Sequence, residues 1–202
     1  MDEDTLISLA QQGDLDAFNQ LVLAYQDLAY HCAYRIMGES DAAEDATQDA
    51  FISAFRKLDS FRGGSFRAWL LRIVTNRCYD VLRYRRRRPI ANLNPTDQHG
   101  EEIESPPWLA DSGESPEERA TRMELNQAIQ HCLQDLPPVF RTVAVLVDVQ
   151  GMDYEEAAHI IGKPLGTVKS RLSRARARLR NCLQQFWELL PDAFRLEAES
   201  VS

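Results

Sequence analysis

The chain has 202 residues, of which 44% are hydrophobic, and a formal net charge of −8. This length and apolar content are sufficient for the cores of two small domains. The three residues after Met1 are acidic, and no run of roughly 18 apolar residues follows. Both features argue against a signal peptide and a membrane anchor. We therefore expect a cytoplasmic protein with no membrane insertion.

Charged residues are strongly segregated along the chain. Residues 1–55 carry one base and eleven acids, whereas residues 56–88 carry eleven bases and two acids. Residues 89–121 are acidic again, with one base and eight acids, and residues 163–180 carry seven bases and no acid. The two separate basic segments favour contacts with nucleic acid, and the acidic segments favour a protein partner.

The four cysteines are far apart in the sequence and lack a CxxC pair; they are Cys32, Cys78, Cys132 and Cys182. Each falls on a predicted helix among apolar neighbours. We therefore predict four buried, reduced thiols, with no metal site and no cofactor.

Helix-forming residues recur at helical intervals while β-branched runs are scarce, so the predicted fold is all-α, with no substantial sheet. In the first half, apolar residues at spacings of three and four predict helices over 14–37 and 41–58. The glycine-bearing segment that follows breaks the second helix. Ser65 is the predicted N-cap of a third helix, over 66–88.

Residues 89–114 hold prolines and glycines among acidic and polar residues with no apolar period, which indicates a flexible acidic linker. Such a linker would leave the spacing of the flanking domains unfixed in the free protein. Helical order resumes at Ser115, where a capping box with proline at the first helical position predicts a helix to about Leu136. A further helix is predicted over 139–149.

The second half ends in a helix-turn-helix pattern. A capping box opens a short helix over 154–161, and a longer basic helix starts at Thr167 and continues past Arg180. In such a motif the second helix enters the major groove, where its early exposed residues reach base edges and later arginines contact phosphates. The candidates are Thr167, Lys169, Ser170, Arg171, Ser173 and Arg174 for bases, and Arg176, Arg178 and Arg180 for phosphates. The alternative is a basic helix face that only contacts solvent. In that case the capped first helix and the spacing of the turn would both be coincidences.

A second candidate nucleic-acid surface lies in the first half, on the loop Ser60–Ser65 and the basic helix after it. Glycines between aromatic residues allow a splayed single strand to approach closely. Arginine runs alone predict only nonspecific phosphate binding, but hydrogen-bonding groups share this surface. The candidates are Ser60, Phe61, Arg62, Gly63, Gly64, Ser65, Asn76, Arg77, Asp80 and Arg83. We interpret Phe66 and Trp69 as core residues.

The helix over 41–58 carries one acidic stripe, formed by Asp41, Glu44, Asp45, Gln48 and Asp49. Metal ligation or paired-carboxylate catalysis would need partners such as histidine, and His31 is the only histidine in this half. We therefore expect no enzyme. A solvated face and a docking surface for a basic protein both fit the stripe.

Taken in order, these segments resemble the sigma-70 superfamily, specifically its small two-domain extracytoplasmic-function members (group IV). The resemblance covers about residues 14–88 and 115–182. It is carried by DAAEDATQDAFISAFRKL at 41–58, SFRGGSFRAWLLRIVTNRCYDVLR at 60–83 and YEEAAHIIGKPLGTVKSRLSRARARLR at 154–180.

The resemblance implies an alternative sigma factor, with sigma region 2 over 1–88 and the helix-turn-helix of sigma region 4 over 115–183. The acidic stripe would then dock on the clamp region of the largest subunits of core RNA polymerase, through Asp41, Asp45, Gln48, Asp49, Phe51 and Phe55. The loop and Asn76 would capture the melted minus-ten element of promoter DNA, and the basic helix would read the minus-thirty-five element as duplex. The linker would thread the RNA exit path, and an anti-sigma factor is an expected partner.

Two other functions are alternatives to a sigma factor. A helix-turn-helix repressor or response-regulator output fits residues 154–180 but leaves 14–88 unexplained. An enzyme acting on nucleic acid should show HExxH, GxGxxG or GxxxxGK[ST], and all three are absent. The C-terminal extension, 184–202, is interpreted as a helical addition that packs on the second domain, with a regulatory contact as the alternative.

Overall fold

The computed structural model describes residues 2–87 and 115–190, and within them every regular element is helical. The first half forms α1 (Glu3–Gln11), α2 (Leu15–Met37), α3 (Ser40–Lys57) and α4 (Phe66–Arg87), with a 3₁₀ turn over Leu58–Ser60. The second half forms α5 (Pro116–Gln134), α6 (Pro138–Ala144), a π-helical turn over Val145–Val149, α7 (Tyr154–Ile161), α8 (Leu165–Leu183) and a 3₁₀ turn over Gln184–Leu189. The all-α prediction is confirmed. The predicted linker over 89–114 lies outside the described residues.

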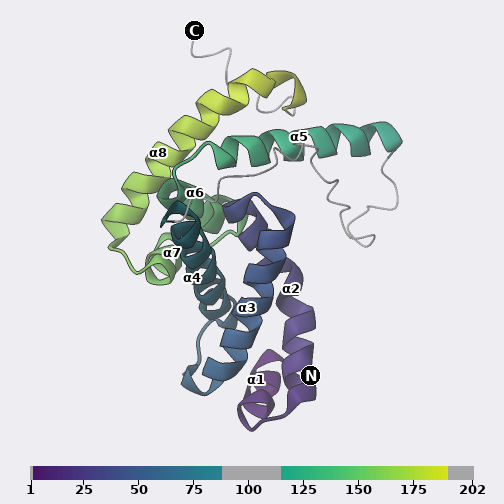
Figure 1. The fold of residues 1–202 in the computed structure, drawn as a ribbon, viewed down its shortest axis with the longest axis vertical. Coiled ribbons are helices and arrows are strands. Elements are labelled where there is room, and N and C mark those ends of the chain that lie inside the picture. Colours follow the sequence, from purple (N-terminus) through teal and green to yellow (C-terminus); the bar gives the residue numbers. More distant parts are fainter. Residues whose placement is uncertain (1, 88–114, 191–202) are drawn as a thin grey trace.

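In the first domain α2, α3 and α4 run side by side (Figure 1) and each contacts the other two. Alanines line the buried face of α3, including Ala43, Ala50 and Ala54, none of which is accessible to solvent. Small side chains let the helices approach closely, so the larger Leu70 and Val74 of α4 fill the space between them. This packing leaves the polar face of α3 directed outward.

The predicted helix boundaries follow from local capping. Gly38 ends α2 in the left-handed conformation, at φ +86°. The Ser65 hydroxyl accepts a hydrogen bond from the Ala68 amide at 3.1 Å at the start of α4. Both predicted capping boxes, at Ser115 and at Asp153, are present with reciprocal side-chain and backbone hydrogen bonds.

Helix α1 was not predicted. The Asp2 carboxylate caps it by accepting a hydrogen bond from the Thr5 amide at 2.8 Å, and Leu6 and Ile7 are buried. It packs on α2 at one end of the bundle (Figure 1). Its last residue, Gln11, reaches the segment after α3, which matters for the candidate site below.

The second domain contains the predicted helix-turn-helix, with α7 followed by α8. Val168, Leu172 and Ala175 form the buried stripe of α8, as the sequence predicts. Helix α8 begins at Leu165, two residues before the predicted start at Thr167. The helix predicted over 139–149 is divided into α6 and the π-helical turn.

The two domains pack against each other instead of standing apart. Helix α2 contacts α5 and α6, helix α4 contacts α7, and one apolar core continues through both domains. Arg141 of α6 is buried and donates a hydrogen bond to the Ile36 carbonyl at 2.6 Å, and Arg35 donates one to Gln130 Oε1 at 3.1 Å. The expectation of an unfixed domain spacing is therefore wrong for this structure, because these contacts between described residues hold the two domains against each other.

The prediction of four reduced thiols is wrong for one pair. Cys132 of α5 and Cys182 near the end of α8 form a disulfide, with their Cα atoms 5.7 Å apart. The separation of 50 positions in the sequence hides this proximity, which exists because the end of α8 packs on α5. Cys32 and Cys78 are buried and free, as predicted.

The described part of the C-terminal extension packs on the second domain. Phe186 lies edge-on to the His131 ring of α5, with ring centroids 5.9 Å apart. Residues 191–202 of the extension lie outside the described residues. Among the helices of 2–87 and 115–190, none is long and apolar enough to span a membrane.

Candidate polymerase and nucleic-acid interfaces

The acidic stripe forms the solvent face of α3. Asp41, Glu44, Asp45, Gln48 and Asp49 are all exposed. Their exposure follows from the helical period, because the alanines between them are buried against α2 and α4. Of the two aromatic candidates, Phe51 is half-buried, and Phe55 is 40% exposed with its ring 4.9 Å from that of Phe18. The structure thus places an apolar ring beside the carboxylates.

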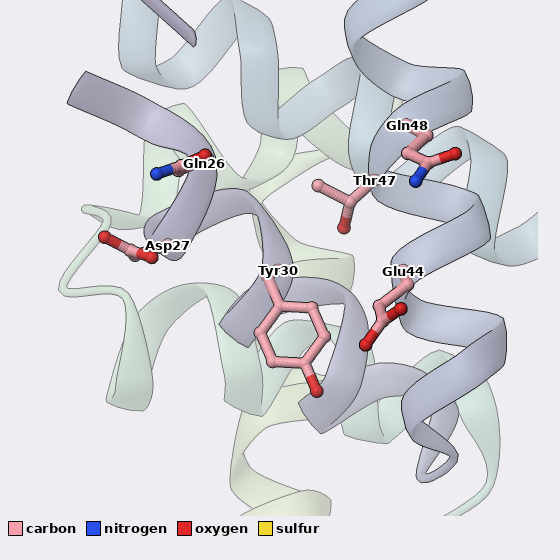
Figure 2. Close-up of a pocket in the computed structure, with 6 residues that line it drawn as sticks. All are labelled: Gln26, Asp27, Tyr30, Glu44, Thr47 and Gln48. Carbon is pink, nitrogen blue, oxygen red and sulfur yellow. The ribbon is translucent and has the colours of Figure 1, made fainter. Parts of the chain in front are cut away.

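A groove between α2 and α3 adjoins this stripe. Figure 2 shows its six lining residues, which are Gln26, Asp27, Tyr30, Glu44, Thr47 and Gln48. Glu44 and Gln48 belong to both the groove and the stripe. The lining holds two acids and no base, so its electrostatics favour a partner that presents cations or hydrogen-bond donors.

The loop 60–65 is held at its start by hydrogen bonds from another helix. The Gln11 side-chain amide donates to the Leu58 and Phe61 carbonyls, at 3.0 Å each. Gly63 and Gly64 then take φ values of +92° and +89°, which other residues rarely adopt. Gln11 is a positioning residue that sequence reasoning missed, since nothing in its spacing links it to this loop.

The loop's aromatic residue points inward. Phe61 is only 8% exposed and packs near Phe66 and Trp69, with ring centroids 5.8 and 5.4 Å away. As placed here it anchors the loop and offers no ring to a base. The other candidates of the loop are exposed: Ser60, Arg62, Gly63, Gly64 and Ser65.

Helix α4 carries the rest of this surface. Asn76, Asp80 and Arg83 are exposed at helical spacing, and Arg83 forms an ion pair with Asp80. Arg77 is half-buried and donates a hydrogen bond to the Ser53 hydroxyl of α3 at 2.6 Å. Arg77 therefore braces α4 on α3, while the other three face solvent. Arg88 lies outside the described residues.

On α8 the predicted base-reading residues share the outer face. Lys169, Ser170, Ser173 and Arg174 are exposed, and Thr167 and Arg171 are half-buried. The Ser170 hydroxyl donates to the Thr167 carbonyl at 3.0 Å. The helix therefore presents a mixed cationic and hydrogen-bonding surface, which is what base edges require.

Two of the later arginines of α8 have partners inside their domain. Arg176 pairs with Asp148, with contacts of 2.5 to 3.2 Å, and this hydrogen bonding raises the pKa of the guanidinium. The Arg178 guanidinium lies 5.6 Å from the Phe140 ring centroid, a cation–π geometry. Asp148 therefore neutralises the charge of Arg176, one of the arginines predicted from the sequence to contact phosphates.

The domain interface places α4 against the second domain. Arg72 of α4 lies 3.4 Å from His159 of α7, measured from Nη1 to Nε2. Tyr79 of α4 forms a hydrogen bond with Thr142. Burial raises the pKa of the Tyr79 hydroxyl, whereas this hydrogen bond and the positive charge of Arg171 act to lower it. Helix α4 thus packs on α7 and reaches Thr142 of α6 across the interface.

Comparison with known proteins identifies the two domains. The family model for Sigma-70 region 2 matches residues 21–88, and the model for Sigma-70 region 4 matches residues 126–179. The RNA polymerase sigma-H factor of Pseudomonas aeruginosa is 37% identical over 183 residues, which are 90% of this chain and 94% of that protein. The chain belongs to the extracytoplasmic-function sigma factors of the sigma-70 family. It is thus a DNA-binding protein of transcription initiation.

Further relatives agree with this assignment. The sigma factor is 37% identical over 172 residues to the ECF RNA polymerase sigma factor SigE of Mycolicibacterium smegmatis, covering 85% of its own length and 63% of SigE. The solved structure of the sigma factor RpoE in complex with the anti-sigma factor NepR, from Bartonella quintana, shares its fold with a TM-score of 0.64 and 31% identity. That similarity covers 83% of this chain and 96% of RpoE.

Proposed function

We propose that this sigma factor binds core RNA polymerase and directs it to promoters by reading the minus-thirty-five element as duplex and the minus-ten element as separated strand. The proposal is supported by two differently built surfaces with exposed basic and hydrogen-bonding residues, one in each sigma region. Region 4 offers a helix-turn-helix with an exposed basic helix. Region 2 offers a glycine loop beside a helix with exposed polar and basic residues.

Region 4 is suited to intact duplex. Lys169, Ser170 and Arg174 are exposed on α8, the helix that a helix-turn-helix inserts into the major groove. Arginine and lysine donate to guanine O6 and N7, whereas serine accepts or donates to several bases. Arg178 fits a phosphate contact that sets the register of the domain without reading sequence.

Region 2 is suited to a separated strand. Gly63 and Gly64 leave no side chain over the loop backbone, and nothing lies within 4 Å of where a Cβ would stand on either residue. A flipped base therefore has room to approach the loop, with Asn76 available to hydrogen-bond its edge. Arg83 and the arginines after it fit the strand's phosphates.

The packed arrangement of the two domains is incompatible with simultaneous contact to both elements. The minus-ten and minus-thirty-five elements are named for their positions relative to the transcription start. They are therefore about 25 base pairs apart, which is roughly 85 Å of duplex. Helices α4 and α7 touch in this structure. Binding a whole promoter therefore requires the domains to separate, and we propose that docking on core polymerase stabilises the separated state.

Core polymerase is proposed to dock on the acidic stripe and the adjoining groove of α2 and α3. The contact would be made with the clamp region of the largest subunits. Carboxylates beside a partly exposed Phe55 suit a basic partner with an apolar anchor.

An anti-sigma factor is a further proposed partner, supported by the RpoE–NepR complex among the similar structures. We also propose that the protein acts in the cytoplasm, where RNA polymerase works, and that it has no enzymatic activity of its own.

The variants Arg171→Ala and Arg174→Ala are expected to weaken binding at the minus-thirty-five element by about 1–3 kcal/mol each, because such side chains read base edges. Footprint titrations of the complex with core, on promoters with intact and altered minus-thirty-five elements, measure the loss. Arg178→Ala is the matched control and should weaken binding to both promoters alike. Equal losses on both promoters for Arg171→Ala and Arg174→Ala would assign these residues to phosphates instead.

A further inference from the structure

A cluster of potential metal ligands surrounds the disulfide of region 4, away from both DNA surfaces. The Sγ atom of Cys182, a ring nitrogen of His131 and a carboxylate oxygen of Asp135 all lie within 4.8 Å of one another. His131 and Asp135 are one turn apart on α5, and their Nε2 and Oδ2 atoms are 3.7 Å apart. Cys132 of α5, the partner of Cys182 in the disulfide, is buried next to this cluster and is a candidate fourth ligand once the disulfide is opened.

We propose that Cys132, Cys182, His131 and Asp135 form a zinc site when the disulfide is reduced. The inference rests on the proposed function in one respect, because a sigma factor at work with RNA polymerase is in a compartment that keeps thiols reduced. There the Cys132–Cys182 bond is open and its two sulfurs are available as ligands. Thiolate, imidazole and carboxylate are the ligand types that Zn²⁺ takes in four-coordinate sites.

The chemistry balances with a dithiol as reductant. A dithiol transfers two electrons and two protons to the disulfide, becoming a disulfide itself and leaving two cysteine thiols. Zn²⁺ then displaces one proton from each thiol and binds the thiolates. Oxidation by a disulfide reverses the first step and releases the metal.

His131 and Asp135 already lie at the separation that a zinc ion requires, whereas the two sulfurs must move apart once the disulfide is reduced. Zinc–ligand bonds of about 2.0–2.3 Å place tetrahedral ligand atoms about 3.5 Å apart, close to the His131–Asp135 separation. His131 and Asp135 are exposed and free to adjust, whereas Cys132 is buried and fixes one corner of the site. Phe186 of the C-terminal extension packs against the His131 ring and partly shields the site from water.

The site would fasten α8 to α5 in both redox states, by a covalent bond when oxidised and by the metal when reduced. The reduced, metal-free protein would lack this fastening. The end of α8 and the extension after it should then loosen from α5, on the helix that carries the minus-thirty-five surface.

Cobalt titration of the full-length protein tests the proposal. The protein is reduced with a phosphine, stripped of metal with a chelator, and titrated anaerobically with Co²⁺ and then Zn²⁺. We expect one equivalent of Co²⁺ to bind, with thiolate-to-cobalt charge-transfer and tetrahedral d–d absorption, and Zn²⁺ to displace it. Protein oxidised with diamide should bind none.

Variants at the exposed ligands keep the test independent of folding. His131→Ala and Asp135→Asn should each weaken Co²⁺ binding about tenfold or more. Cys182→Ser should weaken binding and about halve the charge-transfer absorption at saturation, because Cys132 then remains as the single thiolate ligand. His159→Ala, an exposed histidine of α7, is the control and should bind as the wild type does. Less than one equivalent bound by the reduced wild type, or charge transfer of undiminished intensity in Cys182→Ser, would overturn the site. Neither result bears on promoter-directed transcription, which is measured separately with core polymerase.

Discussion

The double variant Asp45→Arg with Asp49→Arg should lose binding to core RNA polymerase while its fold survives. Both carboxylates are exposed on α3, one turn apart, and neither takes part in the α2–α3–α4 core. Reversing two charges turns attraction to a basic partner surface into repulsion. Close interfacial charge pairs are worth about 1.5–7 kcal/mol, so the expected loss of affinity is about 100-fold or more.

Pull-down and gel filtration with purified core measure this loss, and thermal melts followed by circular dichroism report the fold. The pair Glu117→Arg with Glu124→Arg reverses two exposed acids of α5 outside the stripe and makes the same change of net charge, so it is the control. Retained core binding by the Asp45/Asp49 double variant, at an unchanged melting temperature, would mean that the stripe is only a solvated face.

The variant Arg141→Met is expected to release the two domains from each other in the free protein. The buried guanidinium donates hydrogen bonds to the Ile36, Gln134 and Leu136 carbonyls, at 2.6, 2.6 and 3.1 Å. Burial already lowers the pKa of Arg141, and a methionine would leave these carbonyls without a donor. Of these bonds only the one to the Ile36 carbonyl crosses the domain interface, so we expect the packed state to lose about 1.5–3 kcal/mol relative to the separated one.

Small-angle scattering should then show a larger radius of gyration, and amide exchange should accelerate at the end of α2. The free variant should also bind a minus-thirty-five duplex more tightly, because α4 would no longer pack against α7 of the helix-turn-helix. Gln130→Ala is a second variant with a smaller expected effect. Gln130 accepts a hydrogen bond from Arg35 and donates one to the Tyr34 carbonyl at 3.2 Å. Both bonds cross the domain interface, so the Gln130→Ala substitution should not disturb the fold of region 4. An unchanged radius for both variants would show that these contacts do not hold the domains together.

Features governed by neighbours within one helix were predictable from the sequence. The caps at Ser65, Ser115 and Asp153 depend on residues three positions away, and the buried stripe of α8 depends on the helical period. The same rules could have found α1, where Asp2 precedes Thr5 and the apolar Leu6 and Ile7. The pattern is short, and nine helical residues give weak periodicity.

Features governed by packing between distant segments were not predictable. The disulfide joins residues 50 positions apart, and Gln11 bonds to carbonyls 47 and 50 positions away. The role of Arg141 was only partly predictable. Its sequence context predicts a helix but gives no sign that the end of α2 accepts its hydrogen bond. The inward placement of Phe61 likewise depends on where Phe66 and Trp69 lie in three dimensions.

Transcription by purified core RNA polymerase, with and without this protein, tests the central claim most directly. The template should be a promoter recovered by selecting random DNA for transcription in the presence of both. We predict that core alone gives no specific start, that the protein alone binds the promoter poorly, and that the two together yield a defined transcript with unpaired, permanganate-reactive thymines near minus ten. Tight binding and repression of a duplex operator by the protein alone, with no promoter-specific transcript from core, would contradict the account.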